Sequence, residues 1–485
     1  MAVENYKPDP VFARLGRENG APFYDAVEAA SFPQHILRYR NQRWARKVGL
    51  GGLADEEWIR HFGRFEQLPD NFPKPLAVRY HGHQFRSYNP DIGDGRGFLF
   101  AQLRDDQGRL LDLGTKGSGK TPYSRFGDGR LTLKGGVREA LATEMLEALG
   151  VYTSKTFSLI ETGEDLERND EPSPTRSSVL VRLSHSHVRF GVFQRLAYEK
   201  DAEGIAALVD YCAVHFFPHL LHEAGEARVA GFFSAVVQRT ARLVAQWMAA
   251  GFVHGVLNTD NMNVTGESFD YGPWRFAPAA DPSFTAAYFD QTGLYAFGRQ
   301  AEAGAWNLAQ LGGALSLVAP AETLNEALQT YSAHYESAMA DAFFRRLGIA
   351  RTGDADFAFV ADFLKWMTEA RAPYEQVLFD WFCGAASADR AAKSPAKDFY
   401  ARDSFAGLRA MLTARTPVRP ERLSHAYFAR AVATTMLIDE VEAIWAPIAE
   451  SDDWSRYDAK LADIALAREA YGFDASRYAP LPADA

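Results

Sequence analysis

Two short runs in the sequence carry the groups that a phosphate-transfer site needs. His254-Gly-Val-Leu-Asn-Thr-Asp-Asn261 is followed by Asp270-Tyr-Gly272. A protein-kinase catalytic loop has the form H-R-D-L-x-x-x-N and precedes D-F-G, and its asparagine and second aspartate bind Mg²⁺. The histidine, asparagine and D-Y-G match, but Val256 occupies the position of the catalytic base, and another carboxylate, Asp260, stands beside the asparagine. The pattern predicts a Mg-nucleotide site in which the group that activates the nucleophile has moved.

Three further elements follow the order found in the small lobe of kinases. Gly93-Asp-Gly95-Arg96-Gly97 precedes a predicted strand, where glycines would let backbone amides approach phosphate. Lys116 follows the predicted strand 110–113, and Glu139 stands in the first turn of a predicted helix, where the helix dipole also favours a carboxylate. A strand lysine paired with a helix glutamate grips phosphate in kinases. Each residue alone is most simply a turn or a surface charge, but the ordered set favours a nucleotide site.

Two arginines, Arg182 and Arg189, are seven residues apart. This spacing could place both guanidinium groups on one wall of a cleft, where arginine suits bidentate contact with phosphate. Surface ion pairs are an equally simple explanation. Between the arginines, His185 and His187 have no evident third ligand, so we interpret them as structural residues and not as a zinc site.

A second nucleotide motif competes with this interpretation. Gly114-Thr-Lys-Gly-Ser-Gly119-Lys120-Thr121 matches the P-loop pattern G-x-x-x-x-G-K-[ST], and a predicted strand precedes it. A P-loop must open directly into a helix whose N-terminus faces the phosphates. Here Pro122, Gly127 and Gly129 follow, and glycines are poor helix formers. We therefore favour the kinase-like interpretation over a P-loop.

The elements that would position these residues change along the chain. A hairpin is predicted for 98–103 and 110–113, strands for 156–160 and 179–183, a charged loop for 163–174, and helices for 137–149, ending at Gly150, and for the apolar stripe between Phe233 and Trp247, ending at Gly251. Residues 1–75 read as irregular with short helical stretches, and amphipathic helices dominate after residue 300, with a break between Pro417 and Pro420.

The expected fold is α+β, with the two lobes of a protein kinase and an extension at each end. We divide it into an N-terminal extension (1–75), a β-rich N-lobe with the nucleotide-binding elements (76–195), a helical C-lobe with the catalytic and metal-binding loops (196–350) and a helical C-terminal extension (351–485). A long helix would feed the catalytic loop, as in kinases.

Composition narrows the class of protein. The chain has 485 residues, of which 47% are hydrophobic and 24% charged, as in globular proteins. Its net charge of −10 argues against nucleic acid as a partner, because phosphate binding needs a basic surface. No run approaches a membrane span, and the N-terminus does not read as a secretory signal, so we expect a cytoplasmic protein without a membrane partner. Cys212 and Cys383 are too few for a disulfide framework and are most simply buried apolar residues.

With these residues in hand, the chain resembles the selenoprotein O family of pseudokinase protein adenylyltransferases, which includes the bacterial YdiU-like proteins. The resemblance covers residues 79–311 and rests on Gly82-His-Gln-Phe85, Gly93-Asp-Gly-Arg96, Lys116-Gly-Ser-Gly119, Thr121-Pro-Tyr-Ser-Arg125, Gly127-Asp-Gly-Arg130, Ser186-His-Val-Arg-Phe-Gly191, His254-Gly-Val-Leu-Asn-Thr-Asp-Asn-Met262 and Asp270-Tyr-Gly-Pro273. Members transfer AMP from ATP to hydroxyl side chains of proteins, with ATP reversed relative to kinases. The resemblance implies the same activity here, on Ser, Thr or Tyr of protein substrates or of the chain itself.

Roles follow from the resemblance by position. Asp260 is similar to the general base, and Asn261 and Asp270 are similar to the ligands of Mg²⁺, for which Mn²⁺ is an alternative. The implied nucleotide contacts are Lys116 braced by Glu139, Arg182, Arg189, Asp270, Gly93, Gly95, Arg96, Asp128 and Gly129. The reversed ATP would explain Val256, because attack on a different phosphorus needs the base in a different place.

One departure from the family bears on regulation. Members often carry a cysteine or selenocysteine near the C-terminus, which some bacterial members pair with a cysteine beyond the D-Y-G, but 478–485 and 283–290 contain none. We therefore expect the redox switch suggested for the family to be absent. An ATP-dependent phosphotransferase and a non-catalytic nucleotide-binding scaffold remain alternatives, and a donor such as UTP is not excluded by the sequence.

Overall fold

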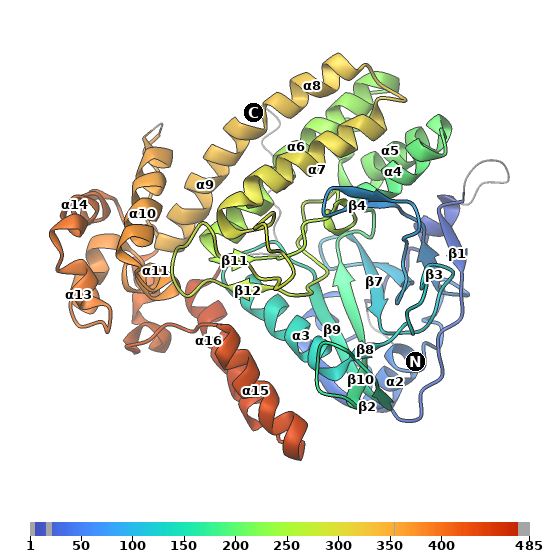
Figure 1. The fold of residues 1–485 in the computed structure, drawn as a ribbon, viewed down its shortest axis with the longest axis horizontal. Coiled ribbons are helices and arrows are strands. Elements are labelled where there is room, and N and C mark those ends of the chain that lie inside the picture. Colours follow the sequence, from blue (N-terminus) through green and yellow to red (C-terminus); the bar gives the residue numbers. More distant parts are fainter. Residues whose placement is uncertain (1–4, 16–21, 354, 474–485) are drawn as a thin grey trace.

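The computed structural model describes residues 5–15, 22–353 and 355–473. Its first half is built on an eight-stranded sheet, and its second half is mainly helical (Figure 1). The sheet has the order β1 (Tyr24–Ala26), β3 (Leu76–Val78), β6 (Leu99–Arg104), β7 (Leu110–Lys116), β10 (Thr175–Ser184), β9 (Lys155–Leu166) and β2 (Ile36–Arg40), with β8 (Leu131–Thr132) also paired to β10. Each of these pairings is antiparallel. The mixed α/β composition, with the strands first, agrees with the sequence-based expectation.

Smaller strands and the helices complete the fold. The two further hairpins are β4 (Gly82–Gln84) with β5 (Ser87–Asn89), and β11 (Phe252–Val253) with β12 (Arg275–Phe276). The helices are α1 (Gln42–Lys47), α2 (Asp55–Phe62), α3 (Leu133–Ala148), α4 (Phe190–Tyr198), α5 (Ala202–Phe216), α6 (Gly225–Ala249), α7 (Gln300–Leu315), α8 (Ala321–Gln329), α9 (Tyr331–Leu347), α10 (Asp356–Ala370), α11 (Tyr374–Asp380), α12 (Ala388–Ala391), α13 (Lys397–Tyr400), α14 (Ala406–Ala414), α15 (Ile438–Ser451) and α16 (Ser455–Tyr471).

Alternation along the central strands explains why both faces of the sheet are covered. Side chains of successive strand residues point to opposite faces. In β10, Leu180 packs in the same cluster as the α3 residues Val137 and Leu141, whereas its neighbours Val179 and Val181 pack in another cluster with α1 and α2. The sheet is therefore enclosed between the N-terminal helices on one face and α3 on the other.

The predicted hairpin is confirmed, and its turn has a local cause. Leu103 pairs with Leu111 across β6 and β7. The carboxylate of Asp105 accepts hydrogen bonds from the backbone N–H of Gln107 and Arg109, and Gly108 adopts a φ of +80° that favours glycine. These contacts reverse the chain and align the strand that ends at Lys116.

Several element boundaries, and two strands, differ from the sequence-based expectation. The predicted loop 163–174 begins too early, because β9 continues to Leu166, whereas its end at residue 174 agrees with the start of β10 at Thr175. Helix α3 begins at Leu133 and not at residue 137, because the Thr132 hydroxyl caps it by accepting from Gly135 N–H. Gly135 and Gly136 have low helix propensity, so the sequence pattern did not indicate this first turn. Within residues 1–75, the strands β1 and β2 join the main sheet and were not predicted.

The helical half supports the segment between β11 and β12. The long helix α6, which the apolar stripe predicted, packs against α5, α7, α8 and α9 and is followed directly by β11. Gly251 makes this turn with a φ of +63°. The helices α10 to α14 form one end of the molecule, whereas α16 returns to pack on α3 (Figure 1). Within the described ranges, we find no helix that combines the length and the apolar character needed to cross a membrane.

Candidate active site

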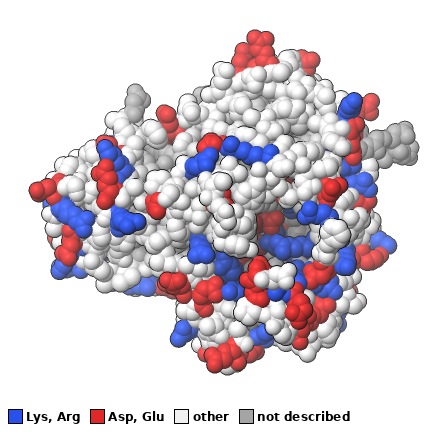
Figure 2. Space-filling model, viewed as in Figure 1, with Lys and Arg blue, Asp and Glu red and all other residues white. Residues whose placement is uncertain are grey.

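A polar cleft of about 690 Å³ collects most of the residues that the sequence singled out. Its lining includes Gly93, Gly95, Arg96, Lys116, Asp128, Gly129, Arg182, Arg189, Asp260 and Asp270. Of the remaining predicted residues, Glu139 contacts Lys116 from α3, and Asn261 lies beside Asp260 in the short 3₁₀ turn Thr259–Asn261. Figure 2 shows the hollow in this face of the molecule, with lysine and arginine side chains gathered in it.

The lysine–glutamate pair forms as predicted, although Glu139 lies elsewhere on its helix. Lys116 Nζ, at the end of β7, is 2.7 Å from Glu139 Oε2 and 3.0 Å from Asp270 Oδ1. Because α3 begins at Leu133, Glu139 lies in the second helical turn, so the helix-dipole argument made from the sequence is wrong for it. The carboxylate is instead held by Lys116 and, at 3.4 Å, by Arg182.

The two arginines share one wall of the cleft and are both buried. Arg182 Nη2 is 3.2 Å from Asp270 Oδ1, and Arg189 Nη1 is 3.9 Å from Asp270 Oδ2. Arg189 also donates to the Tyr80 hydroxyl at 2.9 Å and lies 3.3 Å from Asp94. Among the described residues, Arg182 Nε and Nη1 and Arg189 Nε have no hydrogen-bond partner. Buried donors without acceptors are costly, so this wall is suited to an anionic ligand.

Asp270 is ionised at the centre of these cations. Burial opposes its ionisation, but Lys116, Arg182 and Arg189 outweigh that effect and hold its pKa well below the usual range. Its backbone φ of +61° is uncommon for a residue other than glycine. Its side chain keeps 23% exposure, toward the cleft. The segment after β11 thus presents a charged carboxylate to whatever enters.

The loop after β11 is held in place by hydrogen bonds. Buried His254 shares a 2.9 Å hydrogen bond between Nε2 and the carbonyl of Phe269, which joins the loop to the D-Y-G segment. On the other side, Thr259 Oγ1 accepts from His83 N–H at 2.7 Å, and Asn258 Oδ1 accepts from Phe85 N–H at 3.0 Å. The Gly-His-Gln-Phe motif therefore clamps the loop that carries Asp260.

Asp260 differs electrostatically from Asp270. Its side chain is buried, and burial raises its pKa to about 6, with Arg189 acting in the opposite direction. Its Oδ1 atom has no hydrogen-bond partner among the described residues, and a Cβ at Gly82 would lie 2.8 Å from this oxygen. Glycine at 82 thus leaves space for the carboxylate. A carboxylate with a pKa near neutrality can accept a proton at physiological pH.

The glycine loop needs glycine at positions 93 and 97 because neighbouring residues lie too close to its backbone for a side chain. A Cβ at Gly93 would lie 2.5 Å from the Tyr123 ring, and one at Gly97 would lie 2.0 Å from the Thr115 carbonyl oxygen. The hydroxyls of Thr121 and Ser124 donate to backbone carbonyls of the loop at 2.5 Å. The Thr-Pro-Tyr-Ser-Arg motif therefore supports the loop, a function that its sequence did not reveal.

Two predicted contacts lie at the rim of the cleft. Asp128 is exposed and pairs with Arg168 at 2.8 Å, and Gly129 adopts a φ of +72° beside Gly119, whose N–H donates to its carbonyl at 3.1 Å. They close the loop over the cleft. Asp94 and Tyr80, which hold Arg189, were not predicted, although Asp94 stands inside the glycine motif.

The predicted metal ligands could bind a divalent cation, but they do not form a complete coordination shell by themselves. Asn261 does not line the cleft, and its Nδ2 donates to the Val256 carbonyl at 2.9 Å, which leaves its amide oxygen available. Asp260 and Asp270 present their carboxylates to the cleft. Oxygen donors from one or two carboxylates together with substrate phosphates are typical of Mg²⁺ sites. The described residues contain no group of three or more His, Cys, Asp or Glu side chains arranged for a metal. A cation here would therefore need further oxygens from water or from a bound ligand.

The P-loop interpretation does not match the structure. Gly114 lies within β7, where a Cβ would come 2.0 Å from His187 Nε2, so glycine permits close packing there. Lys120 is exposed and absent from the cleft lining, and no helix begins between Lys120 and the start of α3 at Leu133. The histidines interpreted as structural residues, His185 and His187, are both buried. The backbone N–H of His187 donates to the Asp112 carboxylate, and that of His185 donates to the Glu267 carboxylate.

Comparison with known proteins defines the class. A family model described as protein adenylyltransferase SelO matches residues 9–465, and the chain belongs to this family. Among its relatives, a protein named protein nucleotidyltransferase YdiU from Synechocystis sp. is 51% identical over 352 residues, which cover 72% of each chain. Proteins of the same name from Gloeobacter violaceus (45% over 462 residues, 93% of each chain) and Myxococcus xanthus (37% over 466 residues, 95% of this chain and 93% of the relative) match over nearly their whole length.

Proposed function

We propose that the chain is a protein adenylyltransferase that moves AMP from ATP to a Ser, Thr or Tyr hydroxyl of a protein and releases pyrophosphate. Its family and the name of its relatives support the reaction class. The single observation that carries the site assignment is the position of Asp260, whose buried and unpaired carboxylate oxygen lines the cleft beside Arg189, while the kinase base position holds Val256. The order of sheet, α3 and catalytic segment also supports a kinase-like division into two lobes.

The chemistry needs one proton acceptor and several fixed cations. The acceptor hydroxyl gives its proton to Asp260 as its oxygen forms a bond to the α-phosphorus of ATP, and the bond from that phosphorus to the bridging oxygen of pyrophosphate breaks. Lys116, Arg182 and Arg189 bind the phosphate oxygens and neutralise the charge that develops on the leaving group. These cations are already held by Glu139, Asp94 and Asp270, so little reorganisation is required.

Asn261 and Asp270 are the residues that would hold Mg²⁺, or Mn²⁺ in its place. The bound ion would supply charge neutralisation and orientation of the phosphates. Asp270 is suited to this because its pKa is far below neutrality, so it stays ionised throughout the physiological range. Glu139 stabilises Lys116 and does not itself line the cleft.

The labelled phosphate distinguishes the proposed reaction from its rivals. Protein incubated with Mg²⁺ and ATP labelled at the α-phosphate should label itself or proteins of an added lysate, and mass spectrometry should show added AMP on Ser, Thr or Tyr. ATP labelled at the γ-phosphate should give background only. Label from the γ-phosphate alone would identify a phosphotransferase, and nucleotide binding without transfer of either label would identify a scaffold.

A further inference from the structure

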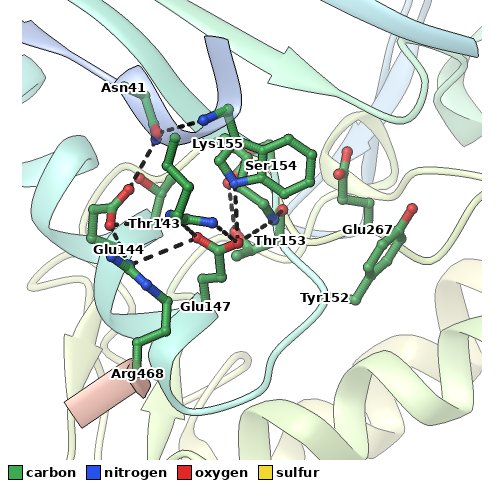
Figure 3. Close-up of polar contacts among 12 residues, drawn as sticks. Asn41, Thr143, Glu144, Glu147, Tyr152, Thr153, Ser154, Lys155, Glu267 and Arg468 are labelled. Carbon is green, nitrogen blue, oxygen red and sulfur yellow. Dashed lines mark hydrogen bonds and ion pairs between the residues drawn. The ribbon is translucent and has the colours of Figure 1, made fainter. Parts of the chain in front are cut away.

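An ionic cluster at the C-terminal half of α3 joins distant parts of the chain (Figure 3). We call it the rear cluster and define it as Arg43, Glu144, Glu147, Lys155 and Arg468. Arg43 comes from α1, the two glutamates from α3, Lys155 from the start of β9, and Arg468 from the C-terminal helix α16. The cluster therefore connects both ends of the chain to the helix that carries Glu139.

The contacts of the rear cluster are close, and its carboxylates are buried, whereas the Arg43 and Arg468 side chains keep 36% and 19% exposure. Arg468 Nη1 lies 2.5 Å from Glu144 Oε2 and 3.9 Å from Glu147 Oε2. Arg43 Nη1 donates to Glu147 Oε1 at 2.9 Å, and Lys155 Nζ is 4.0 Å from the same oxygen. The glutamate side chains are only 8% and 5% exposed. Removing one partner leaves a buried carboxylate without its opposite charge, so the contacts together hold α3 in place.

Helix α3 transmits this anchoring to the cleft. Glu139 and Glu147 lie on the same helix, eight residues apart, which is roughly 12 Å at the helical rise. A helix of this length behaves as a rigid rod, so the position of Glu147 determines how far Glu139 reaches. Glu139 in turn holds Lys116 at 2.7 Å and Arg182 at 3.4 Å.

A second connection runs from Lys155 to Asp270. Lys155 Nζ donates to the Thr153 carbonyl, and the adjoining Ser154 N–H donates at 2.8 Å to the carbonyl of Ser268, two residues before Asp270. The Tyr271 hydroxyl, next to Asp270, lies 2.7 Å from Ser268 Oγ. Both the lysine grip and the predicted metal ligand are thus supported from the rear cluster.

No residue that lines the 690 Å³ cleft comes from the described part of 351–473. The C-terminal extension therefore does not touch a nucleotide in that cleft directly. We propose that Arg468 is a positioning residue: through Glu144 and Glu147 it holds α3 where Glu139 supports Lys116, and so sets the affinity for Mg-ATP. This inference rests on the proposed use of the cleft for a nucleotide.

The test compares two arginines of the C-terminal region. Arg468→Ala removes the contact to α3, whereas Arg430→Ala removes an ion pair to Asp463 on the same helix α16 without touching α3. Calorimetric titration with Mg-ATP should show a dissociation constant raised roughly ten-fold for Arg468→Ala, because residues that orient site groups typically cost 10–100-fold. Arg430→Ala should bind as the unaltered protein does, and Arg468→Lys, which keeps the charge, should recover part of the affinity.

Thermal unfolding of each variant separates positioning from general destabilisation. Unchanged Mg-ATP affinity in Arg468→Ala, or equal loss in Arg430→Ala, overturns the inference. Where Arg468→Ala does not fold, Glu144→Gln takes its place, since an amide oxygen can still accept from Tyr39 and Asn41; the same weakening is expected, and normal affinity refutes it. Because titration does not depend on which phosphate moves, failure of the proposed reaction stays distinguishable from failure of this inference.

Discussion

Asp260 and Asp270 are two carboxylates in one cleft whose surroundings push their pKa values in opposite directions. Burial raises the pKa of Asp260 to about 6, whereas for Asp270 the surrounding lysine and arginine side chains outweigh burial and keep the pKa well below its usual range. Such separation is typical of sites in which one acid exchanges protons and the other remains charged. At the residue scale this is the physical basis for a base at 260 and a ligand at 270.

Asp260→Asn should abolish transfer while leaving nucleotide binding largely intact. The amide cannot accept the proton of the hydroxyl, and loss of general-base assistance typically costs 10²–10⁴-fold. Asp270→Asn is the matched control: it should weaken Mg-ATP binding, because it removes the carboxylate between Lys116 and Arg182 that is suited to the ion. Transfer is measured with α-labelled ATP and binding by calorimetry. Near-normal transfer by Asp260→Asn would show that the base lies elsewhere.

Substitution of Lys116 or Lys120 distinguishes the kinase-like nucleotide site from the P-loop site that the sequence also suggested. Lys116 is buried between Glu139 and Asp270, whereas Lys120 is exposed outside the cleft. We expect Lys116→Ala to lose most ATP turnover and Lys120→Ala to retain most of it. A P-loop would reverse this order, because its phosphate-binding lysine would be Lys120. An active Lys116→Ala beside an inactive Lys120→Ala would refute the site.

At the scale of elements, the sequence predicted structure that depends on neighbouring residues, but it did not predict contacts between residues far apart in the chain. The hairpin around Asp105 and the helix ending at Gly150 are encoded by turn residues and apolar spacing, and both are found. The true start of α3 was missed because Gly135 and Gly136 read as a break, while the cap by Thr132 overrode their poor helical propensity.

The site could be predicted in kind but not in its connections. The sequence named the residues that meet in the cleft because kinase-like motifs keep their order along the chain. It did not reveal that Asp94 pairs with Arg189, since that contact joins a loop to the start of α4 across 95 residues. The rear cluster could not be predicted from the sequence either, because Glu144 and Arg468 are far apart in the chain and meet only through tertiary packing.

Gly114→Ala tests whether glycine at this position of the P-loop-like motif is needed for close packing of β7 against His187. Ala at 114 would place its Cβ 2.0 Å from His187 Nε2, so β7 or the histidine must move. We expect a loss of about 1–3 kcal/mol in the free energy of unfolding, as for other overpacked cores. Gly313→Ala in α7 is the control, because nothing lies within 4 Å of its added Cβ. Urea denaturation measures both; equal stabilities would contradict the packing role.

At the scale of the whole molecule, the two cysteines predict insensitivity to reductant. Cys212 and Cys383 are both buried and free, and burial raises the pKa of each thiol. A buried thiol with a raised pKa is a poor nucleophile. Transfer assayed with and without dithiothreitol should agree, as should that of Cys383→Ser measured in both conditions. Several-fold activation of the unaltered chain by reductant would show that a thiol regulates it.

The rear cluster also makes the stability of the whole chain depend on pH, because Glu147 joins α1, α3 and α16. Burial opposes its ionisation, but Lys155, Arg43 and Arg468 outweigh this and lower its pKa from 4.5 to about 2. A carboxyl group with a lower pKa in the folded state stabilises that state above its unfolded pKa and loses this contribution as the pH falls. This stabilisation is therefore lost as the pH falls from about 4.5 toward 2.

Glu147→Gln should therefore unfold more easily at neutral pH and show a flatter dependence of unfolding free energy on pH between 4.5 and 2. Urea titrations at several pH values measure both. Glu302→Gln is the control: hydrogen bonds from Arg299 and Arg86 also lower the pKa of Glu302 to about 2, but its side chain is 51% exposed, where ion pairs add little to stability. Glu302→Gln should keep the acid slope of the unaltered protein. If Glu147→Gln keeps that slope as well, the acid sensitivity of the fold arises outside the rear cluster.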